Sequence, residues 1–377
     1  MSVPQNEHPQ GGHGASFTNT GRASVARSKT IHQLVHTLSY GDAISGEVLA
    51  LQRSFRALGM ESEIYALNIH PVYKAVARIF KSFPQDFDGE VLLHYSLGSP
   101  LNDLYRALVR ARRGLVYHNL TPARWFEGVN PRIAADIEHG VRELPELCRV
   151  TDNLIADSAF NAGELAVLGF SAKVLNLPLD AEKWKVEPNP GFASMLSADP
   201  GIHLLHVGRI APNKCIQDII KVFYFLHRYV NEQSKLWLVG IDIDTELYSF
   251  ALKRLVHELD LQGAVQFVGG RADSEVKALY QSCSAYLCMS EHEGFCLPVV
   301  EAMYFGLPVI AYASSALPDT VGNGAVLVRE KRHAEIAELV GRVHSDALLR
   351  KSLVDAGLQR AGELTLEKFH AQVAGLF

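Results

Sequence analysis

Short apolar runs alternate with amphipathic stretches along the chain from Thr30 onward. Buried strands are predicted at IHQLVHTL, SEIYAL, VLLHYS, GLVYHN and NLIADS. Apolar residues recur at helical spacing in EVLALQRSFRALG, PVYKAVARIFKSF and LNDLYRALVRARRG, and a further helix is expected near Asn161. Such alternation favours a parallel sheet that is covered by helices on both faces.

The stretch 179–201 interrupts this rhythm with three prolines and two glycines, so we place a domain junction there. The alternation then restarts, with strands at IHLLHVGRI, KLWLVGI, AVQFVG, AYLCMS and PVIAYA. We therefore predict an α/β protein with two doubly wound, Rossmann-like domains that face a central cleft. The expected parts are a flexible tail at 1–29, an amino-terminal domain at 30–182, a carboxyl-terminal domain at 183–363, and a helix at 364–377 that packs back towards the first domain.

Composition excludes several classes of protein. The chain has 377 residues, of which 48% are hydrophobic, so it can bury cores in both domains. Acidic residues outnumber basic ones, 41 to 36, which argues against nucleic-acid binding. None of the five cysteines lies in a Cys-x-x-Cys pair, and neither a signal peptide nor an apolar run of bilayer length is present. A cytoplasmic protein in a reducing compartment is expected.

The segment SEHEGFCLPVVEAMYFGLPVIAYA, residues 290–313, carries candidate chemistry. Glu293 follows a predicted strand, and Glu301 lies in the helix that begins near Leu297 or Pro298. The backbone N–H groups of Gly294, Phe295, Cys296 and Leu297 would point out of the start of this helix, where phosphates bind, and the two carboxylates can accept hydrogen bonds from sugar hydroxyls. The alternative is a helix with an ordinary acidic first turn and a solvent-facing glutamate.

A second segment, HVGRIAPNKCIQDII, places Arg209 and Lys214 after a strand that ends at Gly208. Two cations beside the start of a helix form a receptor for a diphosphate, because Arg can bind two oxygens and Lys adds a point charge. Solvated surface charges are the alternative. The position at the carboxyl end of a strand favours the diphosphate receptor.

Together these segments resemble the carboxyl-terminal domain of the retaining glycosyltransferases of the GT-B fold, specifically family 4. The family pattern reads G-R-x(4)-K and later E-G-F-x-x-P-x-x-E, and the matching residues here are Gly208, Arg209, Lys214, Glu293, Gly294, Phe295, Pro298 and Glu301. Cys215 and Cys296 stand where glycine is common in the family, which puts the identity of the donor sugar in doubt. The resemblance implies a nucleotide diphosphate sugar as donor, no further cofactor and no metal.

The family also has a glycine-containing loop after its first strand and a histidine after a later one. Here the loop is Gly41 to Gly46, whose glycines allow a phosphate to approach the backbone closely, although a plain turn fits the same letters. By the resemblance, Gly46 belongs to the donor site and His118 contacts the donor sugar. His94 is a rival at an equivalent strand end.

The letters Asp242-Ile243-Asp244 match the metal motif of the other major transferase fold, but a loop that caps a helix is the favoured interpretation. The resemblance implies retention of the anomeric configuration. Since no covalent nucleophile is evident, we expect front-face substitution in which the leaving phosphate helps to deprotonate the acceptor.

The sequence thus predicts an enzyme that transfers a hexose to a glycan or lipid-linked saccharide in bacterial surface polysaccharide biosynthesis. The base and the sugar stay open here, and among donors we favour GDP-mannose. A sugar-nucleotide epimerase or hydrolase, or a non-catalytic nucleotide- or glycan-binding partner subunit, is the alternative. An oxidoreductase is disfavoured because no glycine-rich dinucleotide motif follows a strand.

A predicted helix at LNDLYRALVRARRG carries Arg106, Arg110, Arg112 and Arg113 near the apolar and basic stretch VYKAVARIFKSF. Such a surface can bind anionic lipid peripherally at the inner face of a membrane or the phosphates of a lipid-linked acceptor, but the membrane interpretation is the less favoured one. Ordinary solvated helix faces are the alternative.

Overall fold

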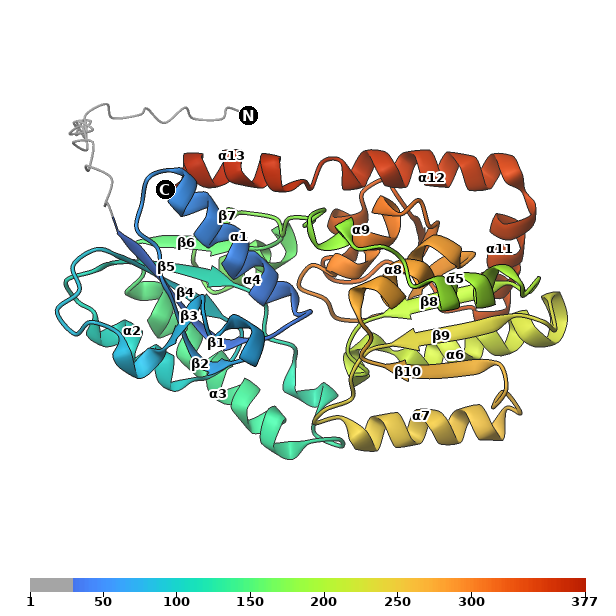
Figure 1. The fold of residues 1–377 in the computed structure, drawn as a ribbon. Helices are drawn as coiled ribbons and strands as arrows, with labels where there is room; N and C mark the ends of the chain where they lie inside the picture. The colour runs from blue at the N-terminus through green and yellow to red at the C-terminus, as the bar shows by residue number, and fades with distance from the viewer. Residues whose placement is uncertain (1–29) are drawn as a thin grey trace, which may run out of the picture.

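The computed structural model describes residues 30–377, and the predicted tail at 1–29 lies outside them. Two parallel sheets form two domains that lie side by side (Figure 1). The first sheet contains β1 (Ile31–Leu38), β2 (Ile64–Ile69), β3 (Ala77–Ile79), β4 (Glu90–Tyr95), β5 (Arg112–Tyr117), β6 (Asn153–Ala156) and β7 (Lys173–Val174). The second contains β8 (His203–Val207), β9 (Lys235–Val239), β10 (Val265–Gly269), β11 (Ala285–Cys288), β12 (Val309–Tyr312) and β13 (Val326–Val328).

The strand orders are β3-β2-β1-β4-β5-β6-β7 and β10-β9-β8-β11-β12-β13. In each sheet the direction of winding reverses, between β1 and β4 in the first and between β8 and β11 in the second. This reversal marks the point where ligands bind in doubly wound folds. The prediction of an α/β fold with two Rossmann-like domains is therefore confirmed.

Helices cover both faces of each sheet, so the central strands are buried on both sides (Figure 1). The helices are α1 (Ala43–Ala57), α2 (Pro100–Ala107), α3 (Pro131–Arg149), α4 (Ala159–Val167), α5 (Pro190–Ser197), α6 (Ile216–Phe225), α7 (Glu246–Glu258), α8 (Asp273–Ser282), α9 (Leu297–Tyr304), α10 (Leu317–Val321), α11 (His333–Ser345), α12 (Ala347–Ala361) and α13 (Leu366–Leu376). The short helix α5 lies within the proline-rich stretch between the sheets.

Side-chain caps fix where two helices of the first domain begin. The Asp42 side chain accepts a hydrogen bond from the Ser45 amide at the start of α1, and the Ser158 side chain accepts one from the Asn161 amide at the start of α4. Because α1 follows β1 and α4 follows β6 after short loops, both helix starts lie at the carboxyl edge of the sheet.

The helix predicted for PVYKAVARIFKSF is wrong. The segment forms a 3-10 turn at Pro71–Tyr73, the edge strand β3, and a second 3-10 turn at Phe80–Ser82. Its apolar residues do not share one buried face, since Val72 and Ile79 are exposed. Because β3 pairs with β2, the backbone groups along the outer side of β2 have hydrogen-bond partners. A helix in this segment would leave them unpaired.

The predicted basic helix is also wrong beyond residue 107. Arg106 lies on α2, where it pairs with Asp103 and Glu143, but Arg112 lies on β5 and pairs with Glu90. The extended backbone of β5 is required for its register with β4, and it carries Arg112 and Arg113 away from the helix surface. The four arginines therefore do not form one basic helix face.

Helix α13 packs on α1 of the first domain and not on the sheet that precedes it in the chain (Figure 1). Its residues Phe369 and Val373 share a buried cluster with Ile31, Leu51 and Phe55. Through α13, the end of the chain supplies part of the core of the first domain.

Replacement of Phe369 by alanine is expected to lower the free energy of unfolding by about 3 to 5 kcal/mol, because the side chain is fully buried and its removal leaves a cavity. Chemical denaturation provides the measurement. Phe250→Ala is the matched control, since Phe250 is exposed and its loss is expected to cost little. A Phe369 variant as stable as the control would contradict the packing of α13.

No helix within residues 30–377 combines the length and the apolar character that are needed to cross a bilayer.

Candidate functional site

The carboxyl edges of the two sheets face each other and are in contact. Asn119 follows β5 of the first domain, and His292 lies in the loop that follows β11 of the second. The Nε2 atom of His292 lies 2.5 Å from Oδ1 of Asn119, and both residues are buried. Asn119 also donates hydrogen bonds to Asn161 and Glu164 of its own domain.

Gly294 lies at a close approach between the backbones of the two domains. A Cβ atom at this position would lie 2.9 Å from Cβ of Asn119 and 3.0 Å from the carbonyl oxygen of His118. The loop after β11 therefore needs glycine here because no other residue fits against the first domain.

The Gly294→Ala variant is expected to lower the free energy of unfolding by about 1 to 3 kcal/mol, because the added methyl group forces the two edges apart. Hydrogen exchange at the backbone amides of His118 and Glu293, which donate to the Tyr95 carbonyl and the Ser315 hydroxyl, should become faster. Gly163→Ala on α4 is the control, since its Cβ would meet no atom within 4 Å. Unchanged exchange in Gly294→Ala would contradict the close contact.

Lys214 and Glu293 form a buried ion pair at the carboxyl edge of the second sheet. The Lys214 Nζ atom donates to Oε1 and Oε2 of Glu293, at 2.7 and 2.6 Å. Burial alone would raise the pKa of Glu293, but the charge of Lys214 and its hydrogen bonds outweigh burial and lower that pKa. The glutamate is therefore ionised and the lysine carries a positive charge.

Short local contacts hold this pair in place. Lys214 ends the 3-10 turn Pro212–Lys214, and Cys215 then starts α6 in a left-handed conformation with a φ of 49°. The Asn213 side chain donates to the carbonyl of His292, and the Glu291 amide donates to the carbonyl of Asn213. These bonds tie the loop after β8 to the loop after β11.

The start of α9 presents free backbone donors beside this ion pair. Cys296 precedes the helix with a φ of 77°, and Pro298 occupies its first turn. Within residues 30–377 no group accepts a hydrogen bond from the amides of Gly294, Phe295, Cys296 or Leu297. Four free donors at a helix start form a seat for an anion.

Glu301 lies further along α9 and is buried, with both carboxylate oxygens occupied. The Tyr280 hydroxyl donates to Oε2 at 3.0 Å, and Nζ of Lys183 lies 3.2 Å from Oε1. The thiol of Cys296 comes within 4.8 Å of the Glu293 carboxylate and of the Cys288 thiol.

The other predicted donor residues are placed differently. The Arg209 side chain donates to the carbonyl of Ile243 at 2.8 Å, and within residues 30–377 no ion pair joins it to Glu293 or Glu301. Gly46 does not lie in a loop, because α1 already begins at Ala43, and this prediction of its local structure is wrong. Only Gly41 of the two loop glycines has a positive φ, 77°.

Asp242 and Asp244 lie in the loop before α7, but their side chains do not cap it. The residue at the cap position is Thr245, which makes no capping bond of its own and instead donates to the carbonyl of Ile210. The capping role predicted for these aspartates is therefore wrong, although the loop does lead into a helix.

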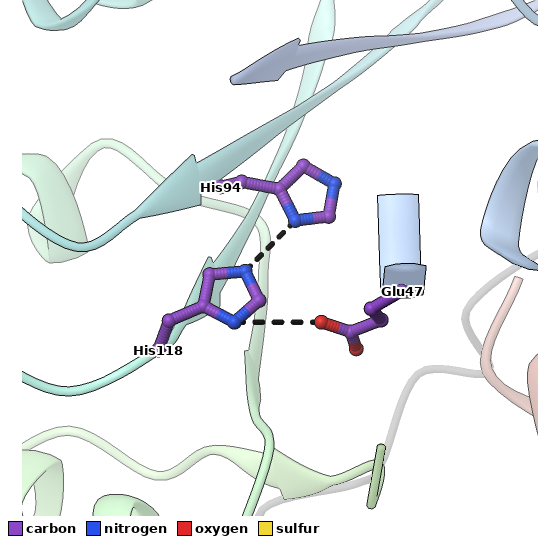
Figure 2. A group of neighbouring side chains, drawn as sticks. All are labelled: Glu47, His94 and His118. Carbon is purple, nitrogen blue, oxygen red and sulfur yellow. Dashed lines mark hydrogen bonds and ion pairs between the residues drawn. The ribbon is translucent and has the colours of Figure 1, made fainter. Parts of the chain in front are cut away.

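His118 and His94 both point into the first domain and contact each other (Figure 2). In the sheet His94 pairs with Val116, so His118, two residues further on, lies on the same face. Nδ1 of His94 is 2.8 Å from Nε2 of His118, and Nδ1 of His118 is 3.4 Å from Glu47 and 3.5 Å from Asp157. The structure therefore turns both ring nitrogens of His118 towards its own domain.

Within residues 30–377, three groups of side chains bring potential metal-ligand atoms together. In each group, a lysine or a hydrogen bond already uses some of these atoms. Cys288, Glu293 and Cys296 come within 4.8 Å of one another, but Glu293 is bound by Lys214. The second cluster, Cys215, Asp218 and Glu291, surrounds Lys331. The third cluster consists of Glu47, His94 and His118. Its two histidines face each other, and a hydrogen bond between them uses Nδ1 of His94 and Nε2 of His118.

Sequence reasoning missed five residues of this region, namely Glu47, Asn119, Asp157, Lys183 and Tyr280. Asp157 ends the segment NLIADS and Asn119 directly follows His118, so their position at strand ends was a usable signal. Lys183 and Tyr280 come from the junction and from α8, and no local pattern connects them with Glu301.

The comparisons with known proteins agree with this geometry. Residues 193–360, less than half of the chain, match the family described as glycosyl transferases group 1. The chain is 35% identical over 115 residues to the MMP alpha-(1->4)-mannosyltransferase of Mycolicibacterium hassiacum, a match that covers 30% of this chain and 28% of that protein. It is 27% identical over 151 residues to the GDP-mannose:cellobiosyl-diphosphopolyprenol alpha-mannosyltransferase of Xanthomonas oryzae pv. oryzae, with 38% of each chain covered.

A third relative, the O-antigen chain mannosyltransferase B of Escherichia coli, is 23% identical over 175 residues. This match covers 46% of this chain and 45% of the relative. The matched segments thus span less than half of the length of these three curated relatives.

Solved structures match over almost the whole described chain. The sucrose-phosphate synthase of Thermosynechococcus elongatus has a TM-score of 0.73 at 18% identity, and it covers 92% of this chain and 98% of its own. Anabaena HepE in complex with UDP and glucose has a TM-score of 0.70 at 17% identity, with the same two coverages. These similarities show the fold, which is the GT-B arrangement of two facing Rossmann-like domains.

Proposed function

We propose that the whole chain, whose residues 193–360 match the glycosyl transferases group 1, is a glycosyltransferase that moves a hexose from a nucleotide diphosphate sugar to a saccharide acceptor. The observation that carries the proposal is the ionised, buried Lys214–Glu293 pair beside the free amides that start α9. A cation and free backbone donors at the carboxyl edge of a parallel sheet fit a diphosphate.

The predicted residues other than His118 keep a role in this proposal; both ring nitrogens of His118 face its own domain, so we do not assign its ring a contact with the donor sugar. Lys214 and the amides of Gly294 to Leu297 neutralise the diphosphate, and Arg209 joins them by leaving the Ile243 carbonyl. Glu293 binds hydroxyls of the transferred sugar and Glu301 binds those of the ribose, in place of their present hydrogen-bond partners. Gly46 at the start of α1 borders the donor from the first domain.

The chemistry follows from the charge that develops during transfer. As the bond between the anomeric carbon and the phosphate breaks, negative charge grows on the β-phosphate and Lys214 and the amides stabilise it. We propose that no metal is required for this step and that the leaving phosphate takes the proton of the attacking hydroxyl. Attack on the same face would retain the anomeric configuration.

The donor and acceptor are proposed from the relatives. The relative from Escherichia coli is named as a mannosyltransferase of the O-antigen chain. The relative from Xanthomonas oryzae is named for GDP-mannose as donor and a cellobiosyl-diphosphopolyprenol as acceptor. We propose that this chain transfers mannose from GDP-mannose to a glycan or lipid-linked saccharide in surface polysaccharide biosynthesis, in the cytoplasm. Peripheral membrane association is not included, since Arg106 and Arg112 are paired with carboxylates.

The test combines donor binding with transfer. Thermal shifts are measured with UDP, GDP, ADP and their sugars, since a bound ligand raises the midpoint of unfolding. Transfer of labelled mannose to lipid-linked saccharides follows, with the anomeric configuration of the product determined by NMR. We expect GDP-mannose to bind and an α-linked product to form.

Two results would replace this proposal. Donor turnover that does not need any acceptor would favour an epimerase or hydrolase. If the wild-type chain binds a nucleotide tightly but shows no turnover, and Glu293→Ala changes only the affinity, the chain is a non-catalytic binding subunit.

A further inference from the structure

A chain of buried polar groups runs through the first domain behind His118. Gln33 on β1, His94 on β4 and His118 after β5 share one face of the sheet, because Val35 pairs with His94 and His94 pairs with Val116. Oε1 of Gln33 is 2.9 Å from Nε2 of His94, and Nδ1 of His94 is 2.8 Å from Nε2 of His118. All three residues are buried.

The Gln33 amide fixes the direction of every hydrogen bond in this chain. Its Nε2 atom donates to the carbonyl of Val48 at 3.1 Å, so its Oε1 atom must accept from Nε2 of His94. A flipped amide would bring two carbonyl oxygens together. Burial keeps His94 neutral by lowering its pKa far below the usual range, so Nδ1 of His94 is an acceptor. Nε2 of His118 must then carry a proton.

The other nitrogen of His118 faces only carboxylates. Its Nδ1 atom lies 3.4 Å from Oε2 of Glu47 and 3.5 Å from Oδ2 of Asp157, and all three side chains are almost completely buried (Figure 2 shows Glu47). A lone pair on Nδ1 would be repelled by the ionised carboxylate of Asp157. A proton on Nδ1 removes this conflict.

The two carboxylates differ in how they are supported. Burial raises the pKa of Asp157, but the charge and hydrogen bond of His118 and a hydrogen bond from the side chain of Asn161 oppose this rise and stabilise the ionised form. Neither oxygen of Glu47 has a hydrogen-bond partner within residues 30–377. Burial raises the pKa of Glu47 to about 8, although the charge of His118 lowers it, so Glu47 is largely protonated at pH 7.

The position of His118 connects this chain of bonds with the site. Its carbonyl oxygen and the next residue, Asn119, form the surface against which Gly294 packs. Asn119 holds a left-handed backbone with a φ of 78° and binds His292 of the second domain. The residue whose ring ends this series of hydrogen bonds thus also supplies backbone that borders the loop at Gly294.

We propose that Asp157 and His94 are positioning residues for the transfer reaction, which hold His118 as a doubly protonated ring inside the first domain and thereby fix the backbone of His118 and Asn119 against the donor loop at Gly294. The positioning role rests on the proposed function, whereas the protonation state of the His118 ring does not. Asp157 is the ionised partner of the imidazolium, and Glu47 is a neutral neighbour.

The first measurement is the protonation of the ring nitrogens in the full chain at pH 7, by long-range nitrogen-proton NMR with labelled histidine. We expect protons on both nitrogens of His118 and on Nε2 alone of His94. Asp157→Asn should remove the Nδ1 proton of His118, whereas Glu47→Gln should keep it. Glu90→Gln, a buried carboxylate at the other end of β4 that pairs with Arg112, is the matched control and should leave both rings unchanged.

An unprotonated Nδ1 of His118 in the wild-type chain would overturn the inference, and this result does not need any variant to fold. The same holds for a Nδ1 proton that survives Asp157→Asn.

The second measurement separates position from binding. Asp157→Asn is expected to lower kcat by about 10- to 100-fold while the dissociation constant of the donor changes by less than about threefold, because the phosphate-binding groups are untouched. Equal losses in kcat and donor affinity, or no loss of kcat, would overturn the positioning role. If the wild-type chain transfers no sugar from any donor, the proposed function fails, and the ring measurement still decides the protonation of His118.

Discussion

Replacement of Lys214 by methionine is expected to abolish transfer and to lower the free energy of unfolding by about 3 to 5 kcal/mol, because it leaves the buried carboxylate of Glu293 without its counter-charge. The loss of rate reflects the missing cation at the diphosphate and should be at least about a hundredfold. Donor turnover and urea denaturation measure the two effects separately.

The double variant Lys214→Met/Glu293→Gln distinguishes these effects. It removes both charges, so it should recover most of the stability while activity stays lost. Lys221→Met is the control, since Lys221 is half-exposed on α6 and its nearest carboxylate, Asp218, lies at 3.9 Å. A double variant that is as unstable as Lys214→Met would show that the lysine acts through packing and not through its charge.

Alkaline pH is expected to destabilise the wild-type chain relative to Glu47→Gln. The pKa of Glu47 rises from 4.5 when exposed to about 8 in the fold, chiefly because of burial. The folded chain therefore holds a proton that the unfolded chain loses between pH 4.5 and 8. The stability from Glu47 is fully present below pH 4.5 and falls by about 1.4 kcal/mol for each unit as pH rises towards 8.

Glutamine resembles the protonated glutamate, so Glu47→Gln should match the wild type near pH 4.5 and exceed it near pH 9. The difference between the two denaturation curves isolates Glu47, because every other titratable group is shared. A constant difference across this range would mean that Glu47 is ionised in the fold at neutral pH, stabilised by His118.

Much of the fold was predictable because parallel strands buried on both faces leave a strong signal of apolar runs. The segments IHQLVHTL and VLLHYS became β1 and β4, with bounds close to those expected. The segment 71–83 failed because an edge strand and its flanking turns are short, and an apolar spacing over so few residues fits a helix equally well.

The site was predictable to the extent that its residues follow strands directly. Lys214 and Glu293 lie 79 residues apart in sequence but meet because β8 and β11 are neighbours in the sheet. The partners of Glu301 were not predictable in this way, since Lys183 arrives from the segment between the domains. The direction in which the His118 ring points depends on Gln33 and Asp157, and no local pattern carries that information.

The placement of α13 affects how the protein is made. During translation, the surface of α1 that receives Phe369 and Val373 stays uncovered until residues 366–376, which follow the strands of both sheets, have left the ribosome. The first domain therefore cannot reach its final stability before the second domain and α13 have been synthesised. A nascent chain that is stalled before Leu366 should expose this apolar surface to chaperones and proteases.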